Sequence, residues 1–253
     1  MSKPNSPPAQ RFAFDGREVD LLHYIYSRPD IKQLRGNPEK VLAAIDDYCQ
    51  KFNQLINVGP TKGPFITNLI AERKPSVMIE LGGYIGYSAI LFGAAVRANG
   101  GKRFLSLENN PEMAAVANQL VELAGLRDTV QILVGSSSDL LVELVSEQKD
   151  IQSVEMLFLD HWQDLYLPDL WLLEQLDVLV PGKSVLLADN VIMPGAPKYL
   201  EWVKATPSQK EGLVEKLGAG SAVPKPELVY ETTLHEFEAE FGKDAVAVTE
   251  VKA

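Results

Sequence analysis

Short apolar segments alternate with helical segments over residues 76–189, and this alternation constrains the fold more than any other feature of the chain. Strands that are apolar on both faces are typical of a parallel sheet, because helices then cover both sides of it. The pattern therefore predicts an α/β fold with a mostly parallel sheet. Five segments have the length and composition of buried strands: SVMIEL, RFLSLE, VQILV, EMLFLD and SVLLAD.

The C-terminal part of the chain follows a different pattern. Two strand-like segments, ELVYETTL and AVAVTEV, have no helical segment between them. Antiparallel strands can be joined by a short turn, whereas parallel strands need a long crossover. We therefore expect an antiparallel pair that closes one edge of the sheet and brings it to seven strands. Before this pair, residues 205–227 are rich in Gly, Pro and charge, which predicts a long surface loop.

The N-terminal region lacks the alternating pattern. Residues 1–17 are rich in Pro, Ser and Gln, which predicts a flexible tail. Helical spacing follows at about 18–27, 37–52 and 64–73, and Asn37 is a natural N-cap of the second helix. No repeat or composition change marks a second domain. We therefore predict one domain over 18–253, with N-terminal helices in 18–74 and the sheet core in 75–253.

Charge and cysteine content exclude several classes of function. The chain carries 24 Lys and Arg against 34 Asp and Glu, a net charge of −10, so we expect no nucleic-acid partner. A single cysteine cannot form an internal disulfide, which fits a reducing compartment. No apolar run approaches the ~20 residues that span a bilayer, and no apolar signal-peptide core is present. These features predict a cytoplasmic protein with no membrane partner, either a monomer or a weak homo-oligomer.

Polar residues follow the predicted parallel strands, at the edge where ligands bind in such sheets. The first strand leads into ELGGYIGYS, whose glycines let the backbone approach a ligand and whose helix begins near Ser88. The second strand ends in Glu108, a carboxylate that can accept both hydroxyls of a ribose. Asp160 follows the fourth strand, and Asp189 and Asn190 follow the fifth. The sequence therefore places a candidate ligand site at this edge.

Each of these features has a simpler explanation when it is taken alone. A glycine-rich turn occurs in many α/β proteins, Glu108 fits a solvated loop acid, and Asp160 fits a helix cap. Their convergence on one edge favours a ligand site. A nicotinamide dinucleotide requires G-x-G-x-x-G, whereas this turn has G-G-x-x-G. The pattern E-x-G-x-x-x-G from Glu80 to Gly86 favours a nucleoside without a pyrophosphate, and S-adenosylmethionine is the obvious candidate.

Four segments resemble those of the catechol O-methyltransferase family. They are NVGPTKG, IELGGYIGYSA, FLDHWQDLYLPD and LLADNVIMPGAP, and they occur in the family's order over roughly residues 40–200. The leading stretch LLHYIYSRPDIKQLRGNPEKVL is similar to fungal members. The resemblance implies a Rossmann-like class I methyltransferase fold with a mostly parallel seven-stranded sheet, an antiparallel edge strand and helices on both faces.

The resemblance also implies a reaction and its residues. It implies that Mg²⁺ is held by Asp160, Asp189 and Asn190, chelates both hydroxyls of a catechol and lowers the pKa of the attacking one. S-adenosylmethionine donates the methyl group, and Asn190, Pro194 and Trp162 contact the acceptor. Glu108 takes the ribose, and the other implied cofactor contacts are Val58, Glu80, Gly82, Tyr84, Ser88, Ser137, Asp160, His161 and Trp162.

The chain departs from the family at the proton acceptor. Where the family has a general-base lysine after D-H-W, this chain has Gln163, which cannot take a proton at ordinary pH. The family's late glutamate falls near His235, which makes His235 a candidate alternative base. Three functions therefore stay open: catechol O-methylation, methylation of another small phenolic acceptor, and cofactor binding without catalysis.

Overall fold

A computed structural model of the protein describes residues 14–218, 222–239 and 242–252. A single sheet has the strand order β3-β2-β1-β4-β5-β7-β6. The first five strands are parallel, and the seventh is antiparallel to both of its neighbours. The strands are β1 (Val77–Leu81), β2 (Arg103–Glu108), β3 (Val130–Val134), β4 (Met156–Leu159), β5 (Val185–Ala188), β6 (Tyr230–Ala239) and β7 (Gly242–Val251).

The predicted mostly parallel sheet with an antiparallel strand at its edge is therefore confirmed. The antiparallel strand is β7, and it lies one place inside the edge strand β6. The predicted tail of residues 1–17 falls mainly outside the described residues.

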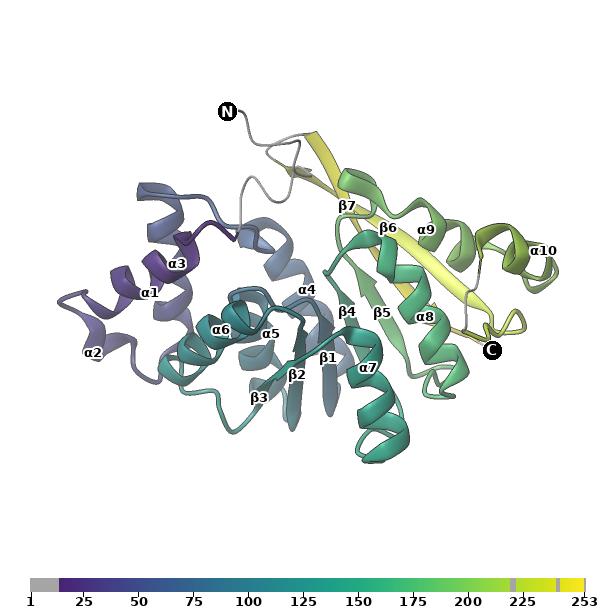
Figure 1. Ribbon diagram of the computed structural model, residues 1–253, viewed down its shortest axis with the longest axis horizontal. Coiled ribbons are helices and arrows are strands. Elements are labelled where there is room, and N and C mark those ends of the chain that lie inside the picture. Colours follow the sequence, from purple (N-terminus) through teal and green to yellow (C-terminus); the bar gives the residue numbers. More distant parts are fainter. Residues whose placement is uncertain (1–13, 219–221, 240–241, 253) are drawn as a thin grey trace.

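Helices cover both faces of the sheet (Figure 1). The helices on the first face precede β1 or follow β1 and β2. They are α1 (Arg17–Tyr26), α2 (Ile31–Leu34), α3 (Pro38–Lys51), α4 (Gly59–Arg73), α5 (Tyr87–Ala98) and α6 (Pro111–Leu123). The second face carries α7 (Ser137–Val142), the π-helix η2 (Glu143–Glu147), α8 (Tyr166–Gln175), α9 (Pro197–Lys204) and α10 (Pro207–Leu217). No helix in the described ranges is long and apolar enough to cross a membrane.

Two apolar cores fill the space between the sheet and these helices. Alternate residues of each strand enter opposite cores, as the two-residue period of a strand requires. In β1, Met78 packs into the first core and Ile79 into the second. Ring contacts tie the helices in place, with Phe92 of α5 edge-on to Phe158 of β4 at 5.2 Å between ring centroids.

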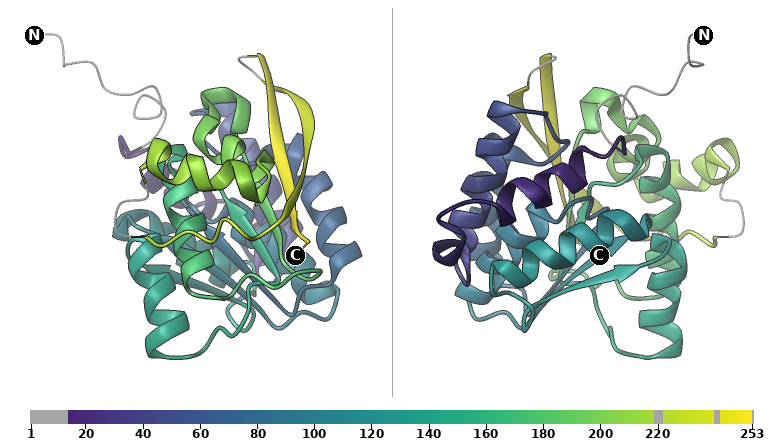
Figure 2. Two further views of the ribbon diagram at one scale, coloured as in Figure 1. Left: turned by 90° about the vertical axis from the view of Figure 1, so that its right-hand side faces the viewer. Right: turned by 60° about the vertical axis from the view of Figure 1, so that its left-hand side comes forward.

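The β6–β7 hairpin extends past the carboxyl ends of the parallel strands (Figures 1 and 2). Ala188, the last residue of β5, pairs with Ala247, so the first five residues of β7 lie beyond the end of β5. Asp244 is among them. The hairpin therefore carries a carboxylate from the end of the chain to the edge where the candidate ligand residues lie.

Two predictions for the helices need correction. The stretch predicted as a long surface loop contains α10, which begins with a capping box between Thr206 and Gln209. Its apolar residues pack on the second core, so tertiary burial outweighs the Gly and Pro content on either side. The helix predicted to begin at Pro64 begins at Gly59 instead, one turn earlier, because Pro60 fits the first turn of a helix.

Candidate functional site

The turn after β1 is built for close backbone contact. Gly82 has φ +91°, and a Cβ at this position would lie 2.7 Å from the carbonyl oxygen of Asp160 and 2.8 Å from the Cα of His161. Gly86 has φ +82°, and a Cβ there would lie 2.9 Å from the Cβ of Ala117. Only glycine satisfies both the left-handed φ and the spacing. The turn is therefore wedged against the loop after β4 and opens directly into α5.

Glu108 at the end of β2 is fixed by backbone donors. Its Oε2 accepts the N–H groups of Gly83 (3.1 Å) and Tyr84 (2.7 Å), and its Oε1 accepts that of Asn110 (2.7 Å). Burial raises the pKa of Glu108, while these N–H groups act in the opposite direction. Each carboxylate oxygen has two lone pairs, so Oε1, which accepts one of these bonds, can still accept a bond from a ligand. The structure thus joins Glu108 to the glycine turn, as the sequence predicts.

Glu80 lies beneath this turn and is fully buried. The hydroxyl of Ser106 donates to its Oε2 at 2.5 Å. Burial raises the pKa of Glu80 to about 7, and the Ser106 bond offsets part of that effect. Ser88, in the first turn of α5, is also buried beside it. Glu80 is therefore an internal group whose charge depends on pH near neutrality.

Tyr84 is held by a residue that sequence reasoning missed. Its hydroxyl donates to Oε1 of Glu18 at 2.6 Å, and Glu18 is buried at the start of α1. Phe14 packs edge-on to the Tyr84 ring, with 6.0 Å between centroids. The N-terminal helix thus fixes one side of the turn. A glutamate on an otherwise apolar helix face is the only sequence signal that could have indicated it.

His161 and Ser137 share one partner, Asp169 of α8. The Ser137 hydroxyl donates to Oδ2 of Asp169 at 2.5 Å, and Nε2 of His161 lies 2.8 Å from the same oxygen. The His161 ring stacks on Tyr166 at 5.1 Å. Trp162, the next residue, keeps half of its surface exposed. The structure therefore brings two predicted cofactor contacts, Ser137 and His161, onto one partner, Asp169, which was not predicted, and Trp162 is next to His161 in the chain.

Asp160 is a half-buried carboxylate close to other acids. Its backbone N–H donates to Leu81, but none of the hydrogen bonds among the described residues ends on its carboxylate. Burial raises the pKa of Asp160 well above the usual range, and Asp189 and Glu80 raise it further. An acidic group in this setting is stabilised by a nearby positive charge.

Asp189 and Asn190, at the end of β5, are held from behind by two residues that were not predicted. Nζ of Lys62, in the first turn of α4, lies 2.6 Å from Oδ1 of Asp189 and 2.6 Å from Oδ2 of Asp244. The Asn190 amide nitrogen donates to Asp244 at 2.8 Å. Burial alone lowers the pKa of Lys62, but the two carboxylates outweigh it and hold that pKa above its usual value.

The donor set fits a hard divalent cation. Asp160 and Asp189 offer carboxylate oxygens, and Asn190 offers an amide oxygen because its amide nitrogen is engaged by Asp244. Oxygen donors of this kind suit Mg²⁺, which binds few protein ligands and keeps several waters. Among the described residues, no group of three His, Cys, Asp or Glu side chains is spaced to hold a metal ion. The candidate set differs from such a group because one of its members is an amide.

Exposed apolar side chains lie on the two short helices that follow the acidic pair, Asp160 and Asp189. The 3₁₀ helix η3 (Gln163–Leu165) follows Trp162, and the π-helix η4 (Val191–Gly195) follows Asn190. These two elements contact each other. The predicted acceptor contacts Trp162 and Pro194 lie on this rim, and its large exposed apolar side chains are Trp162, Leu165, Ile192 and Met193. The rim presents an apolar face beside charged groups.

Gln163, at the position of the family's base, and His235, the candidate alternative base, lie in different places. Gln163 opens η3, directly after Trp162 and close to Tyr166. His235 lies on β6, with its ring 4.5 Å from that of Phe65 on α4. It lines a surface pocket with Arg73 and Glu250. None of the described contacts joins His235 to the acidic pair, so a base role for it stays a prediction.

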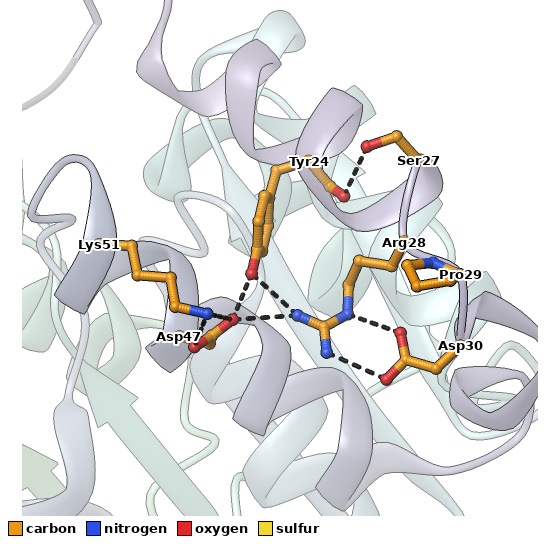
Figure 3. Close-up of a pocket in the computed structure, with 7 residues that line it drawn as sticks. All are labelled: Tyr24, Ser27, Arg28, Pro29, Asp30, Asp47 and Lys51. Atoms are coloured by element: carbon orange, nitrogen blue, oxygen red, sulfur yellow. Dashed lines mark hydrogen bonds and ion pairs between the residues drawn. The ribbon is translucent and has the colours of Figure 1, made fainter.

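A second pocket, of about 440 Å³, lies between α1 and α3 (Figure 3). Arg28 there bonds to Asp30 on one side and to Asp47 on the other, and Lys51 pairs with Asp47. Two cations and two carboxylates neutralise each other within the pocket. It offers no uncompensated group for chemistry, unlike the sheet edge.

Comparison with known proteins shows the family to which the chain belongs. The model of a family described as O-methyltransferase matches residues 39–204, which is more than half of the chain. The chain belongs to the O-methyltransferase family. The matched region includes every candidate residue on the sheet edge from Val58 to Pro194.

Curated relatives in this O-methyltransferase family are similar over about two thirds of the chain. A mouse catechol O-methyltransferase is 45% identical over 173 residues, 68% of this chain and 64% of the relative. A bovine catechol O-methyltransferase is 44% identical over 169 residues, 67% and 61% of the two chains. The chain thus matches less than two thirds of the length of these relatives.

Solved structures share the fold of this O-methyltransferase family member. An O-methyltransferase from Bacillus cereus in complex with SAH superimposes with a TM-score of 0.62 at 20% identity, covering 96% of this chain and 100% of that one. The O-methyltransferase TomG from Streptomyces achromogenes, in complex with SAM, gives 0.57 at 19% identity, with 98% and 100% covered. The predicted class I methyltransferase fold is confirmed.

Proposed function

We propose that the protein is an S-adenosylmethionine-dependent O-methyltransferase that acts on a catechol-type small molecule with the help of Mg²⁺. The observation that carries the proposal is the wedge between Gly82 and Asp160. It joins the turn that suits a nucleoside to the acids that suit a cation. A methyl donor and a chelated acceptor bound at these two places would be neighbours.

S-adenosylmethionine fits the first half of the site. Glu108 offers a fixed carboxylate, with Oε1 as its available acceptor, for the ribose, and His161, Ser137 and Trp162 form a side suited to adenine. Val58, Gly82, Tyr84 and Ser88 would surround the methionine end. Two solved structures of the same fold carry SAH or SAM, which supports the assignment.

Mg²⁺ fits the second half, with Asp160, Asp189 and Asn190 as its protein ligands. When bound there, the ion would supply positive charge that lowers the pKa of a chelated hydroxyl. The exposed apolar rim, with Trp162, Met193 and Pro194, suits the flat apolar ring of a catechol. Relatives named catechol O-methyltransferase support this acceptor class.

The chain's own residues act mainly by placement. Backbone donors fix Glu108, Asp169 orients His161, and Lys62 with Asp244 orients Asp189 and Asn190. Fixing two reactants in line removes much of the entropic barrier to transfer. Gln163 can accept a hydrogen bond but cannot remove a proton, so proton loss from the acceptor must go to water or another group.

Gln163 also favours a second candidate: methylation of a phenolic acceptor other than catechol. Both candidates are tested by the turnover of S-adenosylmethionine over a panel of catechols and monophenols, with Mg²⁺ and with a chelator. We expect methylated catechol with Mg²⁺ and none with chelator. Turnover of monophenols that survives chelation would reject the catechol proposal and favour the second candidate. Absence of turnover on every acceptor, together with intact cofactor binding, would favour a non-catalytic member.

A further inference from the structure

Lys62 occupies a position that helix physics disfavours. It lies in the first turn of α4, where the helix macrodipole is positive and a cation is unfavourable. It is also buried, with 8% of its surface exposed. A lysine in such a place needs strong compensation. The compensation comes from Asp189 and Asp244, each 2.6 Å from its ammonium group.

Asp244 is equally specialised. It lies in the part of β7 that extends beyond β5, on the same face of the strand as Val246 and Val248, which pack toward the first core. Its Oδ2 accepts from Lys62 and Asn190, and its Oδ1 accepts the N–H of Met193 at 3.0 Å. Lys62 and Asn190 thus converge on one oxygen of a buried acid that was not assigned any role.

The net charge of the cluster around Lys62 determines which ions the cluster can bind. Asp160, Asp189 and Asp244 are three acids, and Lys62 is the cation bonded to two of them. With all four groups ionised, the cluster keeps two negative charges, which one divalent ion neutralises. Without Lys62 it would keep three. The ammonium therefore sets the charge that an incoming cation meets.

We propose that Lys62 is a built-in counter-ion of the acidic site, which offsets one of the two negative charges of Asp189 and Asp244 before a divalent cation binds and thereby limits how tightly that cation binds. This inference rests on the proposed metal role of Asp160, Asp189 and Asn190. Lys62 is a positioning residue: it touches a ligand residue and acts through charge. The ammonium group stabilises the metal-free protein, and it repels a divalent cation that binds at the acidic site.

The test is a charge series measured by titration calorimetry with Mg²⁺ alone. Lys62→Gln keeps side-chain donors for both carboxylates but removes the positive charge, so we expect Mg²⁺ to bind about tenfold more tightly. Asp244→Asn removes one negative charge and should weaken binding by about tenfold. The double variant restores the parent charge and should bind within about threefold of the parent. Lys183→Gln, an exposed lysine, is the matched control and should not differ from the parent.

Thermal unfolding without metal gives an independent readout. Lys62→Gln should lower the melting temperature because the buried acids Asp189 and Asp244 lose their counter-ion, and Mg²⁺ should raise the melting temperature of this variant more than that of the parent. The double variant should recover at least half of the loss without metal, since one acid has been removed as well. A merely structural role for Lys62 would predict further loss in the double variant, because another buried partner is removed.

The outcomes separate this inference from the proposed function. Equal or weaker Mg²⁺ binding by Lys62→Gln, or a double variant less stable than Lys62→Gln, overturns the counter-ion role. If the parent does not bind Mg²⁺, the proposed metal site fails, while the melting temperatures without metal still decide whether Lys62 balances the acids. If Lys62→Gln does not fold but the double variant does, the counter-ion role is supported.

Discussion

The two halves of the site are built in different ways. At the ends of β1 and β2, the predicted cofactor residues are fixed by backbone: Gly82 by its φ and its contact with Asp160, and Glu108 by three N–H groups. At the ends of β4 and β5, Asp189 and Asn190 are fixed by side chains from α4 and β7. The first half is a local structure, and the second is assembled from distant segments.

This difference has a physical consequence. Backbone donors are neutral and stay in place when a ligand leaves. The second half depends on buried charges that must balance one another, so its energy changes with each charge added or removed. We therefore expect substitutions in the second half to affect chemistry most, and those in the first half to affect cofactor affinity.

The largest expected effect separates the two halves directly. Asp189→Ala removes a proposed metal ligand and should lower the turnover of S-adenosylmethionine with a catechol by about 10³-fold or more. Cofactor binding by calorimetry should stay within about threefold of the parent, since the altered residue is outside the backbone-fixed half. Glu112→Ala, on the exposed start of α6, is the control and should leave both quantities unchanged.

Undiminished turnover in Asp189→Ala, or in the parent with chelator, would contradict the metal assignment. Because Asp189 also bonds to Lys62, its loss could unfold the chain. Asp160→Asn is a milder variant for the same measurement, since no described hydrogen bond ends on the Asp160 carboxylate.

Glu80 lies between the two halves and gives the next effect. Burial raises its folded-state pKa from 4.5 to about 7, so the folded protein binds the proton more tightly than the unfolded chain does. Its contribution to stability is fully present below pH 4.5 and is lost as pH rises through about 7. Glu80→Gln does not ionise at position 80. The difference in unfolding free energy between this variant and the parent should therefore shift in favour of the variant by about 3 kcal/mol from pH 4 to pH 8.

Urea unfolding of the parent and Glu80→Gln at several pH values measures this effect. A difference between the two proteins that does not change from pH 4 to pH 8 would show that Glu80 is not the titrating group. Buried acids that do not interact with Glu80, such as Glu174, cancel in the comparison because both proteins contain them. Glu108 and Asp160 interact with Glu80, so the measured difference includes the change in their pKa values.

Glu108 tests the backbone-fixed half. Glu108→Ala removes the proposed acceptor for the ribose hydroxyls, and each charge-assisted bond contributes about 1.5–3 kcal/mol, so the dissociation constant of S-adenosylmethionine should rise about 10- to 100-fold. Turnover at saturating cofactor should fall less than it does in Asp189→Ala. Calorimetry that finds unchanged affinity would reject the ribose role, and Glu147→Ala, an exposed acid, is the control.

The smallest expected effect concerns the missing base. Gln163→Lys supplies a proton acceptor where the family has one, and it should raise the rate on a catechol about tenfold near neutral pH. The measurement is a pH–rate profile of the parent, Gln163→Lys, His235→Ala and the double variant. If His235 acts as the base in the parent, His235→Ala lowers the parent rate and affects the Gln163→Lys variant less.

The pH–rate profile of His235→Ala decides whether this histidine takes part in the reaction. An unchanged parent profile in His235→Ala would remove the histidine from the mechanism, consistent with its place against Phe65. No gain from Gln163→Lys on any catechol would point to a different acceptor.

The backbone-fixed half is the part that the sequence predicts well. A turn such as GGYIG encodes its own geometry, because only glycine tolerates the φ of Gly82 and Gly86. The alternation of strands and helices likewise predicted the sheet, since it reflects local periodicity. Asp160, Asp189 and Asn190 stay candidate metal ligands, and the sequence indicates them because they follow strands.

The supporting residues could not be found in this way. Lys62 and Asp244 are 182 residues apart, and nothing local in either segment indicates the other. Their pairing depends on how far β7 extends past β5, which is set by strand register. The same limit applies to α10, whose stability depends on packing against the second core more than on its own composition.

The wedge at Gly82 also bears on how this protein can diversify over evolutionary time. Any side chain at this position would meet the Asp160 carbonyl, so a mutation there would disturb the proposed cofactor site and the proposed metal site together. By contrast, Ile192 and Met193 in η4 face solvent and can be exchanged without touching the turn. New acceptor preferences should therefore accumulate in η4 across a lineage, while residue 82 stays invariant.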